Sequence, residues 1–330
     1  MAPRHTAVLL MAYGSPNRLE EVEPYFTDIR GGRTPSREAI DELSSRYRRV
    51  GVPTPLLAVS MELGRELERL LNLDPPDDQI YTVHLGMKHW TPHIATAVDE
   101  VLESGADRLI AIVLAPHYSK ISTEGYRRKV AAALVTAPRR ATPNGSAAPI
   151  DLDFVESWYE LDGYLDAVAE NVRTVRAEFA HPEEVVAVFT AHSLPARILN
   201  EGDPYQDQLL RTSELVARRA GIEQWRFSYQ SQSHTGEPWL GPDLVDTLEE
   251  LAVQGHRAAL IASVGFIADH LEILYDIDIE AKEKADSLGI ELRRTRMLNA
   301  DPRLARALHA LVAQRSLHPA LPRERGRETK

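Results

Sequence analysis

The chain has 330 residues, of which 43% are hydrophobic and 26% charged, and its formal net charge is −11. This length suffices for two domains with sizeable cores, and the acidic balance argues against broad nucleic-acid binding. The lack of cysteine excludes disulfides, thiolate metal sites and a cysteine-bound [2Fe–2S] cluster. No run approaches the ~20 apolar residues of a membrane span and no signal peptide is visible, so we expect a cytoplasmic enzyme.

Short apolar runs and amphipathic segments alternate along the chain. The amphipathic segments lie at 61–71, 161–179 and 243–253, where apolar residues recur at helical spacing. The apolar runs are short and unbroken, as expected of parallel strands covered on both faces. This alternation predicts an α/β architecture with parallel sheets. The predicted strands lie at 7–12, 80–85, 109–115, 150–155, 185–190 and 259–265.

The proline-rich stretch at 137–149 interrupts this pattern, either as an interdomain linker or as a surface loop. We place a boundary directly after it, which gives a first domain at 1–149 and a second at 150–314. The remaining residues, 315–330, are rich in arginine and proline and are expected to form a frayed tail. Whether the last helix, around 302–312, packs back on the first domain is left open.

A weak internal repeat supports two related halves. The segment 105–117 resembles 255–266, because each runs from a glycine through a basic residue into a strand and a polar tip. No GxGxxG turn follows a strand and no P-loop motif occurs. The sequence therefore disfavours dinucleotide and P-loop nucleotide binding.

Two candidate residues for chemistry end look-alike strands, one in each half. Tyr13 precedes Gly-Ser-Pro after the first apolar run, and His192 precedes Ser-Leu-Pro after the run at 185–190. Residues just past parallel strands line the ligand crevice in α/β proteins. We therefore expect one cleft with a phenol on one side and an imidazole on the other, suited to a flat ligand. The ordinary alternative for the imidazole is a structural histidine.

Acidic residues follow the strand at 259–265. Glu272 comes shortly after the end of this strand, so its carboxylate and the His192 imidazole make a candidate acid–base or metal pair. Asp276 and Glu280 continue from Glu272 at four-residue spacing, which predicts one face of a helix. The row is either a solvated face or a relay that draws a divalent cation inward.

The first half supplies positive charge and hydroxyl groups that suit a ligand with carboxylates. Arginine can bind carboxylates bidentately, although ordinary surface arginine is the alternative for each one taken alone. The segment from Lys88 to Trp90 also follows a strand and therefore faces the crevice end. The other candidates are Arg30, Arg33, Arg46, Tyr47, Thr54 and Tyr126.

In combination, these residues resemble the ferrochelatases, specifically the coproporphyrin III branch of Gram-positive and related bacteria. The resemblance covers about residues 7–312, nearly the whole chain. Its motifs include Met-Ala-Tyr13-Gly-Ser-Pro, Gly86-Met-Lys-His89, Val155-Glu-Ser-Trp-Tyr159, Ala191-His-Ser-Leu-Pro195 and Val264-Gly-Phe-Ile-Ala-Asp-His-Leu-Glu272.

The resemblance implies two similar Rossmann-like, chelatase-type domains, each a parallel sheet flanked by helices, with the active site in the cleft between them. It implies insertion of Fe²⁺ into coproporphyrin III with release of two protons, which forms Fe-coproporphyrin in haem biosynthesis. His192 and Glu272 match the catalytic pair that meets the metal, and Tyr13 matches a residue axial to the porphyrin iron on the opposite face. Porphyrin contacts are implied for Tyr13, Arg30, Arg46, Tyr47, Thr54 and Tyr126, and a metal relay for Asp276 and Glu280.

The resemblance also sets expectations for cofactors and partners. No cofactor is expected to be bound permanently, since Fe²⁺ is a substrate and the [2Fe–2S] cluster of some relatives needs cysteine. The expected partners are coproporphyrin III and Fe²⁺, with no nucleic acid; a monomer is the default, and transient contact with neighbouring haem-pathway enzymes is left open. The alternatives are a chelatase for protoporphyrin IX, sirohydrochlorin or Co²⁺, a non-catalytic porphyrin or haem carrier, and a sugar- or nucleotide-binding α/β module.

Overall fold

The computed structural model describes residues 4–73, 75, 79–136, 150–232 and 236–317. The stretch at 137–149, interpreted above as a linker or loop, and the tail from residue 318 onward lie outside the described residues.

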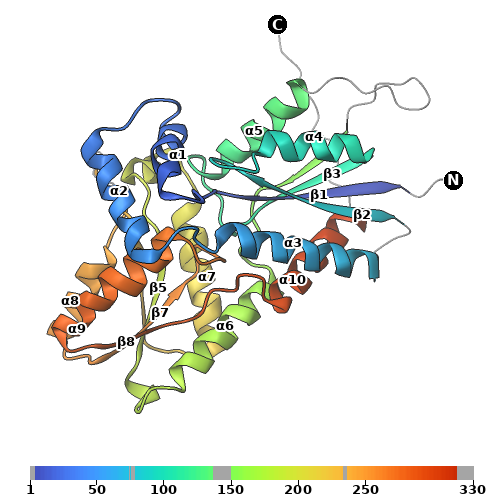
Figure 1. Cartoon of the computed structure of the whole chain (residues 1–330). Coiled ribbons are helices and arrows are strands. Elements are labelled where there is room, and N and C mark those ends of the chain that lie inside the picture. The colour runs from blue at the N-terminus through green and yellow to red at the C-terminus, as the bar shows by residue number, and fades with distance from the viewer. Residues whose placement is uncertain (1–3, 74, 76–78, 137–149, 233–235, 318–330) are drawn as a thin grey trace, which may run out of the picture.

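The first half is built on a four-stranded parallel sheet with the strand order β2-β1-β3-β4. Helices α3 and α10 cover one face and α4 and α5 the other, whereas α1 and α2 stand apart, toward the second half (Figure 1). The strands are β1 (His5–Ala12), β2 (Ile80–Met87), β3 (Arg108–Val113) and β4 (Asp151–Val155). The helices are η1 (Leu19–Glu21), α1 (Val22–Ile29), α2 (Arg37–Val50), α3 (Leu56–Leu73), α4 (Ile94–Ser104), α5 (Thr123–Thr136) and α10 (Pro302–Leu317).

The second half repeats this plan. Its parallel sheet has the strand order β6-β5-β7-β8, so in each half the first strand lies between the second and the third. The strands are β5 (Val186–His192), β6 (Trp225–Gln230), β7 (Ala258–Ser263) and β8 (Glu291–Arg294). The helices are α6 (Asp162–Arg176), η2 (Pro182–Glu184), η3 (Ala196–Glu201), α7 (Tyr205–Ala220), α8 (Leu244–Val253), the π-helix η4 (Ile273–Ala281) and α9 (Lys282–Leu288). The predicted fold of two similar parallel-sheet halves is confirmed.

Strand β1 shows why the first sheet needs helices on both faces. Its residues from Ala7 to Met11 are fully buried, although successive side chains point to opposite faces of a strand. Val8 and Leu10 belong to the core that contains α3 and α10, whereas Leu9 and Met11 belong to the core that contains α4 and α5. The unbroken apolar run therefore reflects burial on both sides.

Two expectations about the ends of the halves are wrong. Strand β4 was assigned to the second domain, but it pairs in parallel with β3 in the first sheet, where Arg108 of β3 also forms an ion pair with Asp153 of β4 at 3.0 Å. The tail was expected to fray from Arg315, but α10 runs through Leu317. Arg315 forms an ion pair with Asp153 at 3.2 Å, and Tyr81 donates a hydrogen bond to the Ser316 hydroxyl at 2.9 Å. Helix α10 therefore packs on the first sheet. The domain boundary after residue 149 stays a prediction.

A buried carboxylate joins the two halves. Asp203 lies between η3 and α7 and accepts hydrogen bonds from the Ser119 hydroxyl at 3.0 Å and from the Lys120 backbone N–H at 2.7 Å, both in the first half. Its other oxygen accepts from the Tyr205 backbone N–H at 3.0 Å, at the start of α7. Charge-assisted bonds of this kind are stronger than neutral ones.

Replacing this carboxylate should loosen the junction. We expect Asp203→Ala to lower the free energy of unfolding by about 1–3 kcal/mol, because it leaves buried donors without an acceptor. Chemical denaturation followed by circular dichroism measures the change. Asp207→Ala, an exposed aspartate one turn further along α7, is the matched control and should cost less than about 1 kcal/mol. Equal losses for the two variants would contradict the assigned role of Asp203.

Candidate active site at the junction of the two halves

The centre of the site is a carboxylate between two imidazoles. His192 is the last residue of β5, and Glu272 directly precedes the π-helix η4. The His192 Nε2 lies 3.5 Å from one oxygen of Glu272, and the His270 Nε2 lies 3.5 Å from the other. The two imidazoles contact different oxygens, so these three residues do not converge on one point.

A close approach of backbones puts the pair together. The N–H groups of Val264 and Gly265 both donate to the Thr190 carbonyl, at 2.9 and 3.1 Å. A Cβ added at Gly265 would lie 2.5 Å from the Ala191 Cβ and 2.9 Å from its Cα. Only glycine permits this contact, which carries the chain after β7 across the tip of β5 and so brings Glu272 to His192.

The charges of this pair reinforce each other. Burial opposes charge on His192, but the neighbouring Glu272 carboxylate outweighs it and raises the pKa of His192 to about 9. Burial also opposes charge on Glu272, yet His192 and then His270 hold the pKa of that carboxyl well below its usual range. The pair is therefore an imidazolium and a carboxylate at neutral pH, and it already holds one proton.

Tyr13 provides the phenol on the first half. It directly follows β1, is 41% exposed, and its ring centroid lies 4.6 Å from that of His89. Burial of its hydroxyl and then the charge of Glu272 raise the pKa of Tyr13 well above its ordinary value, so the phenol is neutral at neutral pH. Leu271, the neighbour of Glu272, packs against Tyr25 and Tyr47 of the first half, so the strand tips of the two halves face one region.

Three of the predicted hydroxyl residues gather near Tyr13. The Thr54 hydroxyl donates to the Ser15 hydroxyl at 2.9 Å, and the Ser15 hydroxyl lies 3.3 Å from that of Tyr47. Tyr126, on α5, is buried, and its pKa is raised by burial and then by Tyr13. The segment from Gly51 to Thr54 therefore brings the Thr54 hydroxyl to the tip of β1.

The predicted arginines lie in different places. Arg46 spans the junction: it pairs with Glu42 at 3.0 Å and with Asp276 of the second half at 3.7 Å. Arg30, at the end of α1, is exposed and lies over the Phe26 ring at 5.9 Å from its centroid. Arg33 is also exposed and donates to the Arg30 carbonyl at 3.4 Å. The structure thus brings Arg46 to the acidic residues and leaves Arg30 and Arg33 on the surface.

The acidic row runs from the interior to the surface on a π-helix. Asp276 is buried and accepts a hydrogen bond from the Ser231 hydroxyl, whereas Glu280 is exposed. Burial, then the charge of Glu272, raises the pKa of Asp276 to about 7, and Glu280 acts in the same direction. Residues 273–281 form a π-helix instead of an α-helix, a geometry that is frequent at functional sites.

Sequence reasoning assigned no role to several polar groups around the pair. The His270 imidazole contacts the second oxygen of Glu272. Its position two residues before Glu272, within the same motif, is the sequence feature from which this role could have been inferred. Gln230 ends β6 beside His192, and its buried amide has no hydrogen-bond partner among the described residues. Gln230 ends a strand that the sequence did not predict, so no pattern indicated this position.

No helix within the described ranges is long and apolar enough to cross a membrane.

Comparisons with known proteins agree on one family. The model of the family described as "Ferrochelatase" matches residues 5–316. A ferrochelatase from Herpetosiphon aurantiacus is 45% identical over 309 residues, covering 93% of this chain and 98% of the relative. A ferrochelatase from Thermus thermophilus is 41% identical, covering 92% and 98%. A coproporphyrin III ferrochelatase from a Geobacillus strain is 37% identical, covering 96% and 99%.

Solved structures agree on the fold. The sirohydrochlorin chelatase SirB from Bacillus subtilis subspecies spizizenii, in complex with cobalt, aligns with a TM-score of 0.55 at 11% identity, covering 95% of this chain and 96% of that one. A multi-domain protein from Deinococcus radiodurans with structural similarity to chelatases aligns with a TM-score of 0.52 at 12% identity, covering 93% and 54%. With the family match over nearly its whole length, the chain belongs to the ferrochelatase family and is a metal chelatase.

Proposed function

We propose that this chelatase inserts Fe²⁺ into coproporphyrin III, releases two protons and forms Fe-coproporphyrin. The observation that carries the proposal is the neutral phenol of Tyr13 in the region of the charged His192–Glu272 pair. A flat macrocycle between them would have a proton-handling face and a phenolic face. The catalytic pair is His192 and Glu272, with Tyr13 axial to the iron.

The distribution of charge suits the exchange of protons for a metal ion. A planar porphyrin keeps its nitrogen lone pairs in the ring plane, and bending it to expose them costs about 1–5 kcal/mol of strain. Glu272 is ionised and can attract Fe²⁺, while His192 must first lose its proton to act as a base. An approaching dication favours that loss, because it repels the imidazolium charge. Metal arrival therefore favours release of this proton to water, which the partly exposed His192 side chain can reach, and the neutral imidazole can then accept a pyrrole proton.

The acidic row supports an entry route for the ion. Glu280 is exposed, Asp276 is buried, and Glu272 is half-buried beside His192, so oxygen ligands follow one another at four-residue spacing from the surface to the pair. Carboxylate oxygens suit a hard or borderline cation that is held transiently. Fe²⁺ is thus a substrate in this proposal, and no cofactor is bound permanently.

The choice of porphyrin rests on charge and on relatives. Coproporphyrin III carries four carboxylates, and the first half offers Arg30, Arg46, Tyr47, Thr54 and Tyr126 as candidate contacts. Relatives at 36–38% identity are named coproporphyrin III ferrochelatase, whereas those at 40–45% are named ferrochelatase without a porphyrin. Protoporphyrin IX is the competing substrate, because the name ferrochelatase without a porphyrin is compatible with coproporphyrin III and with protoporphyrin IX.

Anaerobic Fe²⁺ insertion, followed as loss of free-porphyrin absorbance, tests the substrate. With coproporphyrin III and protoporphyrin IX side by side, we expect the higher kcat/KM for coproporphyrin III, because its additional carboxylates have cationic partners at the rim. Preference for protoporphyrin IX would contradict the proposed substrate but leave the reaction standing. Binding of either porphyrin without insertion would favour a carrier.

Removing the imidazole tests the catalytic pair. We expect His192→Ala to lower kcat by about 10²–10⁴-fold, the range typical of a lost acid–base group, with the porphyrin dissociation constant changed much less. His181→Ala, at an exposed histidine directly before η2, is the control and should leave both quantities unchanged. Wild-type turnover by His192→Ala would overturn the role of His192.

The coupling within the pair can be measured without substrate. The imidazole signals of His192 should titrate near pH 9 in the wild type and at lower pH in Glu272→Gln, because burial then acts without the opposing carboxylate. A histidine whose pKa is higher in the folded than in the unfolded state stabilises the fold. This stabilisation is complete when the pH is below the pKa of the unfolded state, and it is lost as the pH rises through the folded-state pKa of about 9. The stability advantage of the wild type over Glu272→Gln should therefore be present at pH 6–7 and shrink above about 9. An unchanged titration would contradict the ion pair.

A further inference from the structure

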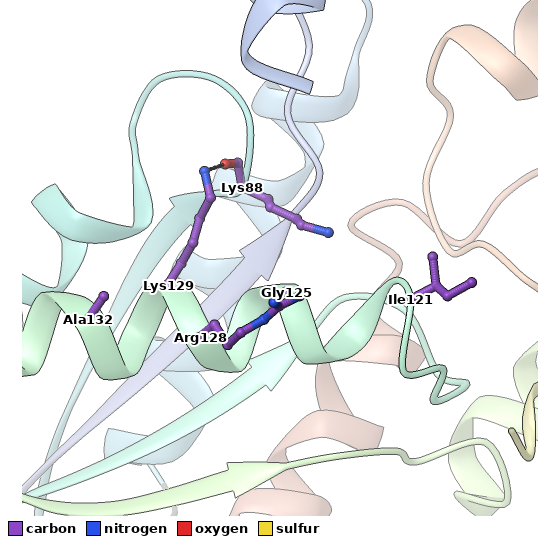
Figure 2. Close-up of a pocket in the computed structure, with 6 residues that line it drawn as sticks. All are labelled: Lys88, Ile121, Gly125, Arg128, Lys129 and Ala132. Atoms are coloured by element: carbon purple, nitrogen blue, oxygen red, sulfur yellow. Dashed lines mark hydrogen bonds between the residues drawn. The ribbon is translucent and has the colours of Figure 1, made fainter. Parts of the chain in front are cut away.

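The two halves of the candidate site are held in place by different contacts. On the first half, Lys129 of α5 donates a hydrogen bond to the Lys88 carbonyl, and both residues line a cavity of about 370 Å³ (Figure 2). The Lys88 ammonium donates to the Ser122 carbonyl at 3.1 Å, so the loop after β2 is bound to the start of α5. On the second half, His270 and Glu272 follow a segment without regular structure, and its position depends on other residues.

The chain between Gly265 and Glu272 is irregular. Residues 266–270 belong to no helix or strand, so no ladder of backbone hydrogen bonds fixes them. The crossing at Gly265 fixes only the start of this segment, whereas His270 and Glu272 lie at its end. A displacement of about 1 Å at a reacting group can lower a rate about 10²-fold, so the support of this segment matters for the reaction.

Asn299, between β8 and α10, holds the middle of this segment through three hydrogen bonds. Its side-chain oxygen accepts from the Asp269 backbone N–H at 2.8 Å, and its side-chain nitrogen donates to the Asp269 carboxylate at 2.7 Å. Its own backbone N–H donates to the Ile267 carbonyl at 2.7 Å. Asn299 has a φ of 52°, in the left-handed region where asparagine is enriched. One residue thus fixes both the backbone and the side chain directly before His270.

Arg294, the last residue of β8, links the two sides of Glu272. Its guanidinium forms a bidentate pair with Asp278 of η4, in which Nε and Nη2 lie 2.6 and 2.8 Å from the two carboxylate oxygens. The same Nη2 lies 3.2 Å from an oxygen of Asp269, and the two side chains are only 16% and 18% exposed, so solvent screens this contact weakly. Carboxylates before and after Glu272 are therefore bound to one cation.

Both residues are themselves fixed by the second sheet and by the last helix. Strand β8 pairs with β7, and the Thr295 N–H, directly after Arg294, donates to the Ile261 carbonyl of β7 at 2.9 Å. Leu298, the neighbour of Asn299, is buried in the core that contains α10. Arg294 and Asn299 therefore lie on a rigid part of the fold, as the support of a reacting group requires.

We propose that Arg294 and Asn299 are positioning residues for metal insertion. Through Asp269 they hold His270 and Glu272 in the geometry that the reaction requires. This inference rests on the proposed function and adds to it two residues that do not act by contact with the macrocycle. Their loss should therefore slow insertion and leave porphyrin binding nearly unchanged. A purely structural role would instead lower the stability of the fold without a selective effect on insertion.

Single-turnover insertion of Fe²⁺ into coproporphyrin III, measured anaerobically with the enzyme in excess, tests the positioning role. We expect Asn299→Gly to slow insertion about tenfold, because small displacements of reacting groups are costly. Glycine accepts the left-handed backbone, so this variant removes the side-chain bonds without adding strain. Arg294→Gln should slow insertion to a similar extent. The dissociation constant of coproporphyrin III, measured by absorbance titration without metal, should change less than about threefold in both variants.

Arg293→Gln is the matched control. Arg293 directly precedes Arg294 on β8 and pairs with Glu178 at 3.0 Å and with Glu291 at 2.8 Å, away from the segment that leads to Glu272. This variant loses ion pairs of similar length at the surface, where such pairs contribute little, and should insert Fe²⁺ at the wild-type rate. Chemical denaturation followed by circular dichroism gives the stability of all three variants.

Slow insertion at nearly unchanged porphyrin affinity in Asn299→Gly and Arg294→Gln, but not in Arg293→Gln, supports the proposal. Wild-type rates in the two variants, a matching loss of porphyrin affinity, or the same slowing in the control would overturn it. If Asn299→Gly did not fold, Arg294→Gln would decide between these outcomes.

A measurement without substrate separates this inference from the proposed function. Hydrogen–deuterium exchange of the free protein should be faster across residues 266–272 in Asn299→Gly than in the wild type, and unchanged there in Arg293→Gln. If the wild type inserted no iron into either porphyrin, the proposed function would fail. Exchange would then show whether Asn299 holds the segment, and equal exchange in Asn299→Gly and the wild type would overturn that.

Discussion

The ion pair between His192 and Glu272 is the interaction on which the rest of the site depends. Moving two charges out of water is unfavourable unless each finds a partner in good geometry, so neither residue is tolerated there alone. The contact exists because Gly265 lets the chain after β7 pass against the backbone of β5. A feature of backbone packing thus sets the protonation state of the reacting centre, and the shift of each pKa depends on the other residue.

Charge is sorted by position around that centre. Negative groups follow one another from exposed Glu280 through buried Asp276 to Glu272, a suitable environment for a cation. The neutral phenol of Tyr13 lies on the other half, and the Lys88 ammonium lies 5.7 Å from its ring centroid. A ligand with a metal-binding centre and an anionic rim is complementary to both the negative and the positive groups around the site. The acidic net charge of the whole chain does not prevent binding of such a ligand, because the local charges decide.

The sequence predicted the fold where burial alone decides the pattern. The buried central strands and the three amphipathic helices lie where periodicity placed them. Strands β6 and β8 were missed, because polar and aromatic residues interrupt them, as at 225–230. Strand β4 was assigned to the wrong sheet, since an apolar run does not specify its neighbour. The π-helix at 273–281 was missed because four-residue spacing reads as an ordinary helix.

The placement of α10 has a consequence for how the protein is made. Leu304 and Leu308 of this last helix share one core with Val8 and Leu10 of the first strand. During synthesis, α3 can cover part of this face of the first sheet early, but the part that α10 covers stays open until that helix has left the ribosome. Domains usually fold as they emerge, starting from the N-terminal one. In this protein the first sheet therefore reaches its final packing only after the second half has been made.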